Sequence, residues 1–152
     1  VVTVTEDEMA KAMVIVMEKS KLVVEAGGAV GVAAILANKV KLSGTTAVIL
    51  SGGNIDPLLL QRVIRHGLAA SDRYTNIAVM LPDRPGQLVL TAQAVADAGA
   101  NVVEVLHTRH GDGLQISEVE LELSIETRGK SHRDEVFESL KAAGLSPRMT
   151  ED

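Results

Sequence analysis

The segment TAVILSGGNIDP, residues 46–57, places a hydroxyl and two glycines directly after a short apolar run. Ser51 can present one hydrogen bond, and Gly52 and Gly53 let the backbone approach another group closely, because glycine has no β-carbon. The apolar run is typical of a buried strand, and Asp56 followed by Pro57 predicts a helix start. A strand that ends on such a turn is a candidate contact for a bound ligand.

A second candidate lies in the stretch DRPGQL, which follows one predicted strand and opens a predicted helix. The N–H groups and the dipole of a helix N-terminus suit a carboxylate. The aspartate could face an ammonium, and an asparagine that opens the next strand could donate or accept. These groups would suit the head group of a free amino acid, although an ordinary Pro-Gly turn is the simpler explanation on spacing alone. The candidate residues are Asp83, Arg84, Pro85, Gly86, Gln87, Leu88 and Asn101.

The glycines of EAGGAVG invite comparison with a dinucleotide-binding loop. The comparison fails, because position 26 is alanine where the first glycine is needed, and no acidic residue lies about 20 residues further on. Close helix packing explains Gly27, Gly28 and Gly31 more simply. We therefore expect no dinucleotide site.

The histidines predict no metal site. His107 and His110 are three residues apart, which places them on opposite faces of a strand, and a third ligand is missing. No Ser–His–Asp or paired-carboxylate arrangement stands out, so the residues alone indicate no hydrolase.

Composition narrows the function classes. The 152 residues are 46% hydrophobic and 23% charged, as in globular proteins. A net charge of −5 and only two aromatic residues, Tyr74 and Phe137, argue against a nucleic-acid partner. The absence of cysteine excludes disulfides and thiolate chemistry. No apolar run reaches the roughly 18 residues of a membrane span and no signal-peptide pattern is present, so we expect a cytoplasmic protein without membrane contact.

The first half predicts alternating strands and helices. VVTVT, residues 1–5, is interpreted as a strand, and a T-x-x-E capping box at Thr5 and Glu8 predicts a helix over about residues 6–20. A small-residue helix, the buried strand TTAVIL and the helix that begins at Asp56 follow. Two buried strands cannot close a parallel sheet, because both sheet edges would stay open. We therefore expect residues 1–70 to be the tail of a larger α/β domain, or to dock on another chain.

After a polar linker, LAASDRYTN, residues 71–152 predict the order β-α-β-β-α-β. An alternating strand over 77–81 precedes a helix over about 87–99, which ends at Gly99 and is expected to bury Leu88, Ala92 and Val95. The strand NVVEVLH and hairpin residues HGDG come next.

The stretch VELELSIE alternates strictly and predicts a strand with one buried face. Its inward residues are Val119, Leu121, Leu123 and Ile125, and its outward glutamates are Glu118, Glu120, Glu122 and Glu126. A second helix, starting at Ser131 and Asp134, is expected to bury Val136, Phe137 and Leu140, and LSPRM to form an edge strand. This is the ferredoxin-like α+β arrangement, with both helices on one face of an antiparallel sheet.

The motifs VVEAGGAVGVAAIL and AVILSGGNID resemble the C-terminal part of the catalytic domain of threonine ammonia-lyases (threonine dehydratases), pyridoxal-phosphate enzymes of the tryptophan synthase β-like fold, and of the related serine racemases. IAVMLPDRPGQL and AGANVVEV resemble an ACT domain, an amino-acid-sensing module. The resemblance covers essentially the whole chain. It implies two domains, a catalytic segment over 1–70 and an ACT domain over 71–152.

The resemblance also implies roles for the first candidate site. In the family, the serine of SGGN hydrogen-bonds the pyridine nitrogen of the cofactor, which here would be Ser51. Gly52 and Gly53 would lie near the ring, and Glu25 corresponds to a family glutamate near the cofactor. A hydroxyl at that nitrogen makes the ring a gentler electron sink than a carboxylate would, which suits elimination of a β-hydroxyl group.

The chain also departs from the family pattern. None of its lysines lies in the Ser-x-Lys context of the Schiff-base lysine, and no run of more than two glycines could form the phosphate loop. We therefore expect this chain to be the last part of the enzyme and to be inactive alone, needing the catalytic N-terminal part as partner. The alternatives are a separate amino-acid sensor and a domain that only holds subunits together. Isoleucine is the natural inhibitor candidate, with valine opposing it, and pairing of ACT domains implies at least a homodimer.

Overall fold

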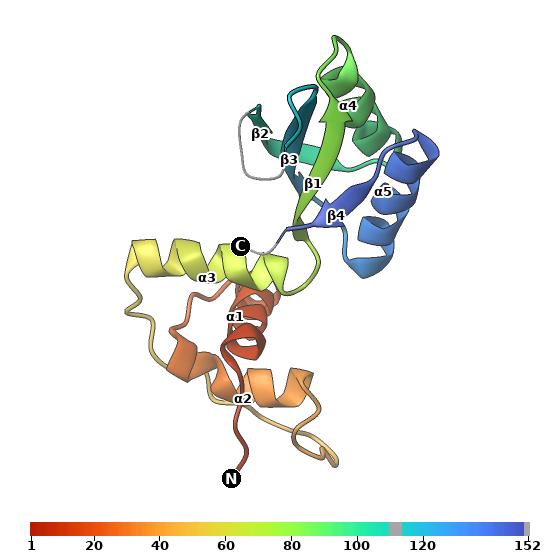
Figure 1. Cartoon of the computed structure of the whole chain (residues 1–152). Coiled ribbons are helices and arrows are strands. Elements are labelled where there is room, and N and C mark those ends of the chain that lie inside the picture. The colour runs from red at the N-terminus through yellow and green to blue at the C-terminus, as the bar shows by residue number, and fades with distance from the viewer. Residues whose placement is uncertain (110–113, 151–152) are drawn as a thin grey trace. The chain divides into compact units, whose positions relative to one another are not determined.

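The computed structural model of the protein describes residues 1–109 and 114–150. The chain divides into two units, Val1–Ser71 and Asp72–Asp152 (Figure 1). The predicted hairpin residues HGDG, which include His110, lie outside the described residues.

The first unit consists of three helices, α1 (Glu6–Ser20), α2 (Ala26–Leu36) and α3 (Pro57–Ala69). The predicted capping box at the start of α1 is confirmed: the Thr5 hydroxyl accepts from the Glu8 N–H at 3.2 Å, and the Glu8 carboxylate accepts from the Thr5 N–H at 2.7 Å. The predicted start of α3 is confirmed too, because Asp56 accepts hydrogen bonds from two N–H groups of the first turn and Pro57 is the first helical residue.

The three helices share a small apolar core in which α1 packs against both α2 and α3. Its buried side chains are Ala12, Met13, Val16, Val24, Ala29 and Ala33. Small residues allow the close approach: a β-carbon on Gly67 of α3 would lie 2.7 Å from the carbonyl oxygen of Ala10 in α1. The packing of this unit therefore depends on short side chains rather than on large ones.

The strands predicted in the first unit are wrong. Residues 1–5 and 45–50 form no strand, and the unit is helical rather than α/β. A strand exists only through ladder hydrogen bonds with a neighbouring strand, and nothing in residues 1–71 supplies one to either segment. Ile49, which the sequence pattern placed inside a sheet, is 88% exposed.

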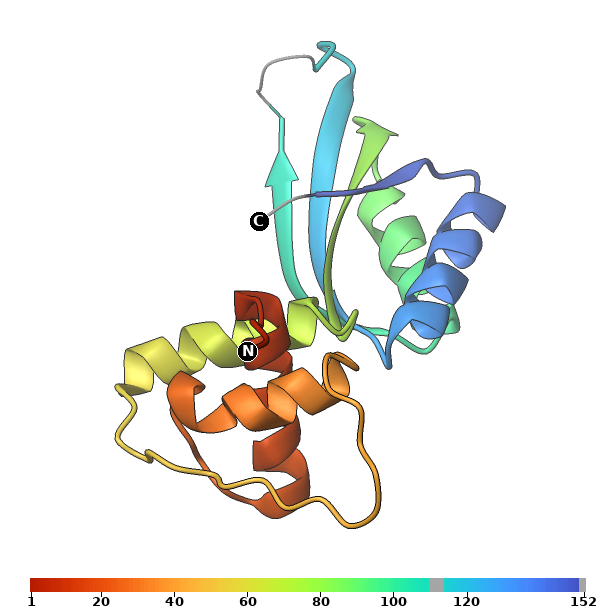
Figure 2. The same cartoon turned by 90° about the horizontal axis from the view of Figure 1, so that it is seen from below.

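The second unit confirms the predicted order β-α-β-β-α-β. Its strands are β1 (Tyr74–Pro82), β2 (Asn101–Thr108), β3 (Glu118–Glu126) and β4 (Pro147–Met149), and its helices are α4 (Gln87–Asp97) and α5 (Lys130–Ala142). The sheet has the order β2-β3-β1-β4 with antiparallel neighbours, and both helices cover one face of it (Figure 2).

The alternation predicted for β3 is also confirmed. Its four inward side chains are each at most 2% exposed, and they pack with Ile77, Val79 and Leu81 of β1 and with Val95, Val136 and Leu140 from the helices. The glutamates lie on the face that carries no helix, where Arg148 of β4 pairs with Glu120. The core of the unit thus lies between the sheet and the two helices.

Some details of the helices differ from the prediction. Ala92 and Phe137, which were expected to be buried, are only half-buried. Leu88 is 43% exposed, because it lies in the first turn of α4, ahead of the buried stripe of Thr91, Ala94 and Val95. Helix α5 begins at Lys130 rather than at Ser131, after Gly129 with a φ of +116° that favours glycine, and no side chain among the described residues caps it.

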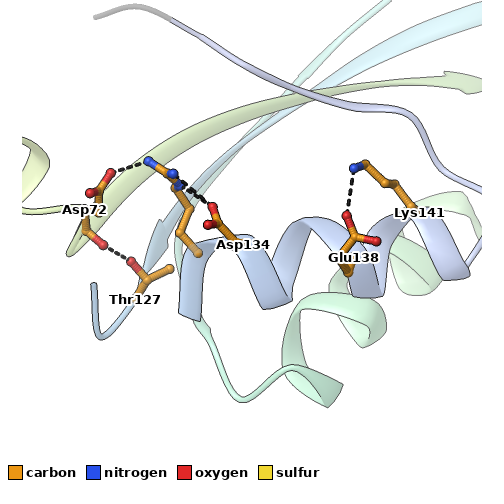
Figure 3. Close-up of polar contacts among 6 residues, drawn as sticks. Asp72, Thr127, Asp134, Glu138 and Lys141 are labelled. Carbon is orange, nitrogen blue, oxygen red and sulfur yellow. Dashed lines mark hydrogen bonds and ion pairs between the residues drawn. The ribbon is translucent and has the colours of Figure 1, made fainter. Parts of the chain in front are cut away.

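A polar cluster fixes the start of the second unit (Figure 3). The Asp72 carboxylate pairs with Arg133 of α5, and the Asp72 carbonyl accepts from the Thr127 hydroxyl. Arg133 also donates to Asp134 at 2.9 Å. Arg133 is only 20% exposed, so its charge-assisted hydrogen bonds are partly shielded from solvent. They hold the chain segment before β1 against α5.

Candidate functional site

An open pocket of about 280 Å³ lies in the second unit, between the end of β1 and the start of α4. This volume lies just below the roughly 300–1,000 Å³ that is usual for small-molecule pockets. Six of the seven residues predicted to bind an amino acid line it, namely Asp83, Arg84, Pro85, Gly86, Gln87 and Leu88.

The backbone at Gly86 shapes one wall of this pocket. Gly86 has φ +92°, a left-handed conformation that glycine adopts without strain, and it directly precedes α4. No side chain among the described residues caps the helix, so the first N–H groups of α4 keep their capacity to bind an anion.

The floor of the pocket is apolar. Leu81, Val119 and Leu121, on the face of the sheet that carries the helices, are 0–2% exposed and contribute to its lining. Leu88, which is 43% exposed, adds an apolar wall to the pocket. Its side chain stays uncovered because it faces the pocket, although it lies on the same face of α4 as the buried residues. The pocket therefore combines polar groups at one side with an apolar base.

The opposite wall carries two residues that sequence reasoning missed as binding residues, His107 and Arg109. Strands β1 and β2 each run antiparallel to β3, so they run parallel to each other and both have their C-termini at the same end of the sheet. Only this topological relationship, and not the residue types of either segment, could have indicated the two residues.

The pocket contains groups of both charges. The Nε of Arg109 donates to a carboxylate oxygen of Asp83 at 3.4 Å, and these side chains are 55% and 40% exposed. Arg84 adds a second guanidinium. With two guanidinium groups against one carboxylate, the charged lining favours an anionic group, while Asp83 remains able to bind a cation.

Asn101 does not belong to this pocket, contrary to the prediction. It opens β2, opposite Glu126, which in turn pairs with Tyr74 at the start of β1. Its side-chain amide donates to the Glu126 carboxylate at 3.2 Å. The start of β2 lies at the end of the sheet remote from Asp83, because the two parallel strands place their N-termini together.

The other predicted site residues lie together in the first unit. The Glu25 N–H donates to the carbonyl oxygen of Gly52 at 2.7 Å, which joins the start of α2 to the turn that follows Ser51. Gly52 has φ +69°, and a β-carbon there would lie 2.3 Å from a carboxylate oxygen of Glu25. Ser51, Gly53 and Glu25 are exposed. The turn therefore presents a hydroxyl and open backbone beside one carboxylate.

Close packing explains two of the three glycines of the EAGGAVG motif. A β-carbon on Gly28 would lie 1.6 Å from the Ser51 carbonyl oxygen, and one on Gly31 would lie 2.8 Å from a methyl of Val48. At Gly27 a β-carbon would meet nothing within 4 Å, so the packing explanation is wrong for that residue.

Among residues 1–109 and 114–150, no three His, Asp or Glu side chains are placed to hold a metal ion. Within the same ranges, none of the helices has both the length and the apolar character that crossing a membrane requires.

Solved structures with a similar arrangement cover about half of the chain. They include the ligand-free regulatory subunit of aspartate kinase from Thermus thermophilus (21% identity, 51% of this chain and 49% of that one, TM-score 0.39). Prephenate dehydratase from Streptococcus mutans is another (18% identity, 50% of this chain and 40% of that one, TM-score 0.42). No family model matches the chain.

Curated relatives match much more of the sequence. The L-threonine ammonia-lyase of Geobacter sulfurreducens is 43% identical over 145 residues, which are 95% of this chain and 36% of that protein. The L-threonine ammonia-lyase of Thermotoga maritima is 40% identical over 149 residues, 97% of this chain and 37% of that protein. The catabolic L-threonine dehydratase TdcB of Staphylococcus aureus is 40% identical over 75 residues, 47% of this chain and 22% of that protein. Over nearly its whole length the chain is thus homologous to L-threonine ammonia-lyases, of which it spans little more than a third.

Proposed function

We propose that residues 72–150 form an ACT-type regulatory domain that binds a free amino acid in the pocket at the start of α4. The observation that carries this proposal is the meeting of Asp83–Leu88 around a single pocket with an apolar floor. The uncapped N-terminus of α4 suits the carboxylate of the ligand, and Asp83 suits its ammonium. The floor formed by Leu81, Val119 and Leu121 suits an aliphatic side chain.

The homology supports a role for this domain within a pyridoxal-phosphate-dependent threonine ammonia-lyase, which converts L-threonine to 2-oxobutanoate and ammonia. In that enzyme the domain would report the level of an amino acid such as isoleucine or valine to the catalytic part.

The turn at Ser51–Gly53 fits one edge of a cofactor site in such an enzyme. Gly28 lies so close to Ser51, and Gly52 so close to Glu25, that neither glycine has space for a β-carbon. Ser51, beside them, is exposed. Ser51 would hold the pyridine nitrogen of pyridoxal phosphate, and Gly52, Gly53 and Glu25 would lie near the ring. The cofactor would supply the electron sink for elimination, while this chain supplies only that contact.

The chain by itself is proposed to be inactive, because the residues present include neither the family's lysine motif nor its phosphate loop. The test is to incubate the purified chain with pyridoxal phosphate and L-threonine and to measure 2-oxobutanoate. Production of 2-oxobutanoate above a protein-free blank would contradict this part of the proposal.

Two copies of the chain are proposed to associate through the second unit. Strand β2 is an edge strand of the sheet, and Val103 and Leu106 on it are 51% and 56% exposed. An edge with exposed apolar side chains favours pairing with another strand. Light scattering that gives a monomer, with and without amino acids, would contradict this association.

The sensor proposal is tested by titrating the purified chain with L-isoleucine, L-valine and L-threonine while its thermal unfolding and heat of binding are measured. A ligand at about 100 times its dissociation constant stabilises the domain by about 2.7 kcal/mol, which raises the melting temperature measurably. A saturable response to one amino acid is expected. A flat response to all three would contradict a sensor in this chain alone, and would leave a domain that only holds subunits together or a site that forms only with the catalytic part.

A further inference from the structure

The ion pair between Asp83 and Arg109 lies in the lining of the pocket. Both side chains contribute to the pocket wall, and the Nε of Arg109 donates to Asp83 at 3.4 Å. A ligand that enters the pocket therefore meets an acid and a base that already neutralise each other.

The backbone holds the two partners at neighbouring strand ends. The N–H of Asp83 donates to the carbonyl oxygen of Ser117 at 2.8 Å, which ties the end of β1 to the residue before β3. Arg109 directly follows β2, whose last residue, Thr108, pairs with Glu120 of β3. Because both ends are tied to the same part of β3, the two charges stay within reach of a small molecule between them.

This ion pair is weak. The side chains are 55% and 40% exposed, and exposed pairs contribute little to stability. The contact of 3.4 Å is also longer than the usual charge-assisted hydrogen bond of roughly 2.7–2.9 Å. A ligand carboxylate offers two oxygens that a guanidinium can bind side by side, a stronger geometry than the single Nε contact. Exchanging Asp83 for a ligand carboxylate therefore favours the complex.

We propose that Asp83 and Arg109 form an exchangeable ion pair that opens onto the ligand: Arg109, together with the N–H groups at the start of α4, binds the free carboxylate, and Asp83 binds the free ammonium. The inference rests on the proposed function and defines the class of ligand that the same pocket selects. Only a ligand that carries both charges restores a partner to each side chain. A ligand with one charge leaves the other side chain of the opened pair without its counter-ion.

The exchange makes Arg109 a specificity-determining residue and defines the class of ligand. The pocket accepts free α-amino acids, whose side chain can lie on the floor of Leu81, Val119 and Leu121. It rejects amino-acid amides, N-acylated amino acids and the N- or C-terminal residues of peptides, in which one of the two charges is missing.

The test uses calorimetric titration of the whole chain with two matched series of probes. The first is L-isoleucine, L-isoleucinamide and N-acetyl-L-isoleucine, and the second is the same three forms of L-valine. The titrations are repeated with Arg109→Gln and with the control Arg148→Gln. Like Arg109, Arg148 pairs with an acidic residue of this sheet, but it does not line the pocket. Its replacement changes the net charge by the same amount as Arg109→Gln.

For the amino acid that binds, both derivatives are expected to bind roughly ten- to a hundredfold more weakly to the unchanged chain, as for the loss of a hydrogen bond to a charged group. Arg109→Gln should weaken the parent amino acid by a similar factor and should not weaken the amide, because the amide has no carboxylate for Arg109 to bind and no longer has to open the ion pair. Arg148→Gln should bind like the unchanged chain.

Two results would overturn the inference in different ways. If the parent amino acid and its amide bind equally, or if Arg109→Gln binds the parent normally, the exchange is wrong while amino-acid binding stands. If none of L-isoleucine, L-valine and L-threonine binds the unchanged chain, the proposed function fails and the inference fails with it. The comparison of probes needs no variant, so it decides the matter even if a substitution disturbs folding.

Discussion

Gly28 and Ser51 are packed so closely that a β-carbon on Gly28 would lie 1.6 Å from the carbonyl oxygen of Ser51. The contact joins α2 to the turn that carries the proposed cofactor contact. The backbone of the glycine-rich helix thus acts as the support of the SGGN turn, and the position of Ser51 depends on the missing side chain at residue 28.

Replacing Gly28 with alanine is expected to destabilise the first unit by about 1–3 kcal/mol, because α2 or the turn must shift to relieve the overlap. The matched control is Gly27→Ala in the same helix, where a β-carbon meets nothing within 4 Å. The control should be neutral or slightly stabilising, since alanine is the better helix former. Helical circular dichroism during urea unfolding measures both. Equal effects of the two substitutions would contradict the packing argument.

The fluorescence of Tyr74 separates the unfolding of the two units. It is the only tyrosine, the chain has no tryptophan, and it lies in β1 of the second unit. Its fluorescence therefore follows unfolding of the second unit, while circular dichroism follows both.

A second prediction concerns His132, which is 3% exposed. Its Nδ1 accepts from the Arg128 N–H at 3.0 Å, and its Nε2 lies 2.8 Å from the carbonyl oxygen of Ala98. Because a carbonyl can only accept, Nε2 is the donor to Ala98, while Nδ1 accepts from Arg128. The ring thereby ties the end of α4 to the start of α5.

Replacing His132 with alanine should destabilise the second unit by about 2 kcal/mol, since two backbone groups lose their hydrogen-bond partner and a cavity forms where the buried ring was. Urea unfolding followed by tyrosine fluorescence measures the loss. Ser131→Ala, at the exposed neighbouring position, should change the free energy of unfolding by no more than about 0.5 kcal/mol. If both variants unfold at the same urea concentration, the proposed tie between the helices is wrong.

The third prediction concerns pH and Glu8. The hydrogen bond from Lys39 at 2.6 Å, followed by the backbone N–H of Thr5, holds the pKa of the Glu8 carboxyl below its ordinary value of 4.5. A lowered pKa in the folded state means that ionised Glu8 stabilises the first unit above pH 4.5. This contribution is lost as the pH falls through the lowered pKa.

Glu8→Gln isolates the charge, because glutamine can keep the capping box. The difference in unfolding free energy between the unchanged chain and this variant should shrink as the pH is lowered from about 7 to about 3. NMR titration of the Glu8 carboxyl should show a pKa that moves upward in Lys39→Met. A constant difference between chain and variant over this range would show that the ion pair adds no stability.

The two units differ in how much of their structure their own residues specify. The alternation of β3 sets one buried face, and the helices that cover it lie in the same 81 residues, Asp72–Asp152, so all elements of the second unit could be predicted. Residues 1–5 and 45–50 have the composition of strands, but a strand also needs a neighbour, and residues 1–71 hold none. Local sequence indicates the tendency, whereas the pairing depends on what lies alongside.

The candidate pocket was predictable on one side only. The stretch DRPGQL shows a turn and a helix start that are local in the sequence, so six lining residues could be named from it. His107 and Arg109 lie at the end of β2, whereas Asn101 opens that strand, as predicted, and so lies at the end remote from the pocket. These placements depend on the direction in which β2 runs relative to β1, which residue types do not encode.

The last prediction separates a sensor from a scaffold at Gly86. A β-carbon there would meet nothing within 4 Å, so a substitution is limited by the φ of +92° rather than by a clash. Gly86→Leu should cost about 1–3 kcal/mol from the left-handed backbone and leave the fold intact, while its side chain occupies the mouth of the pocket. Gly86→Asn is the matched control, because asparagine tolerates this conformation better. In thermal unfolding with added isoleucine or valine, Gly86→Leu should lose the rise in melting temperature and Gly86→Asn should retain most of it. If Gly86→Leu is folded and keeps the full response, the ligand binds elsewhere, and the assignment of this pocket is wrong.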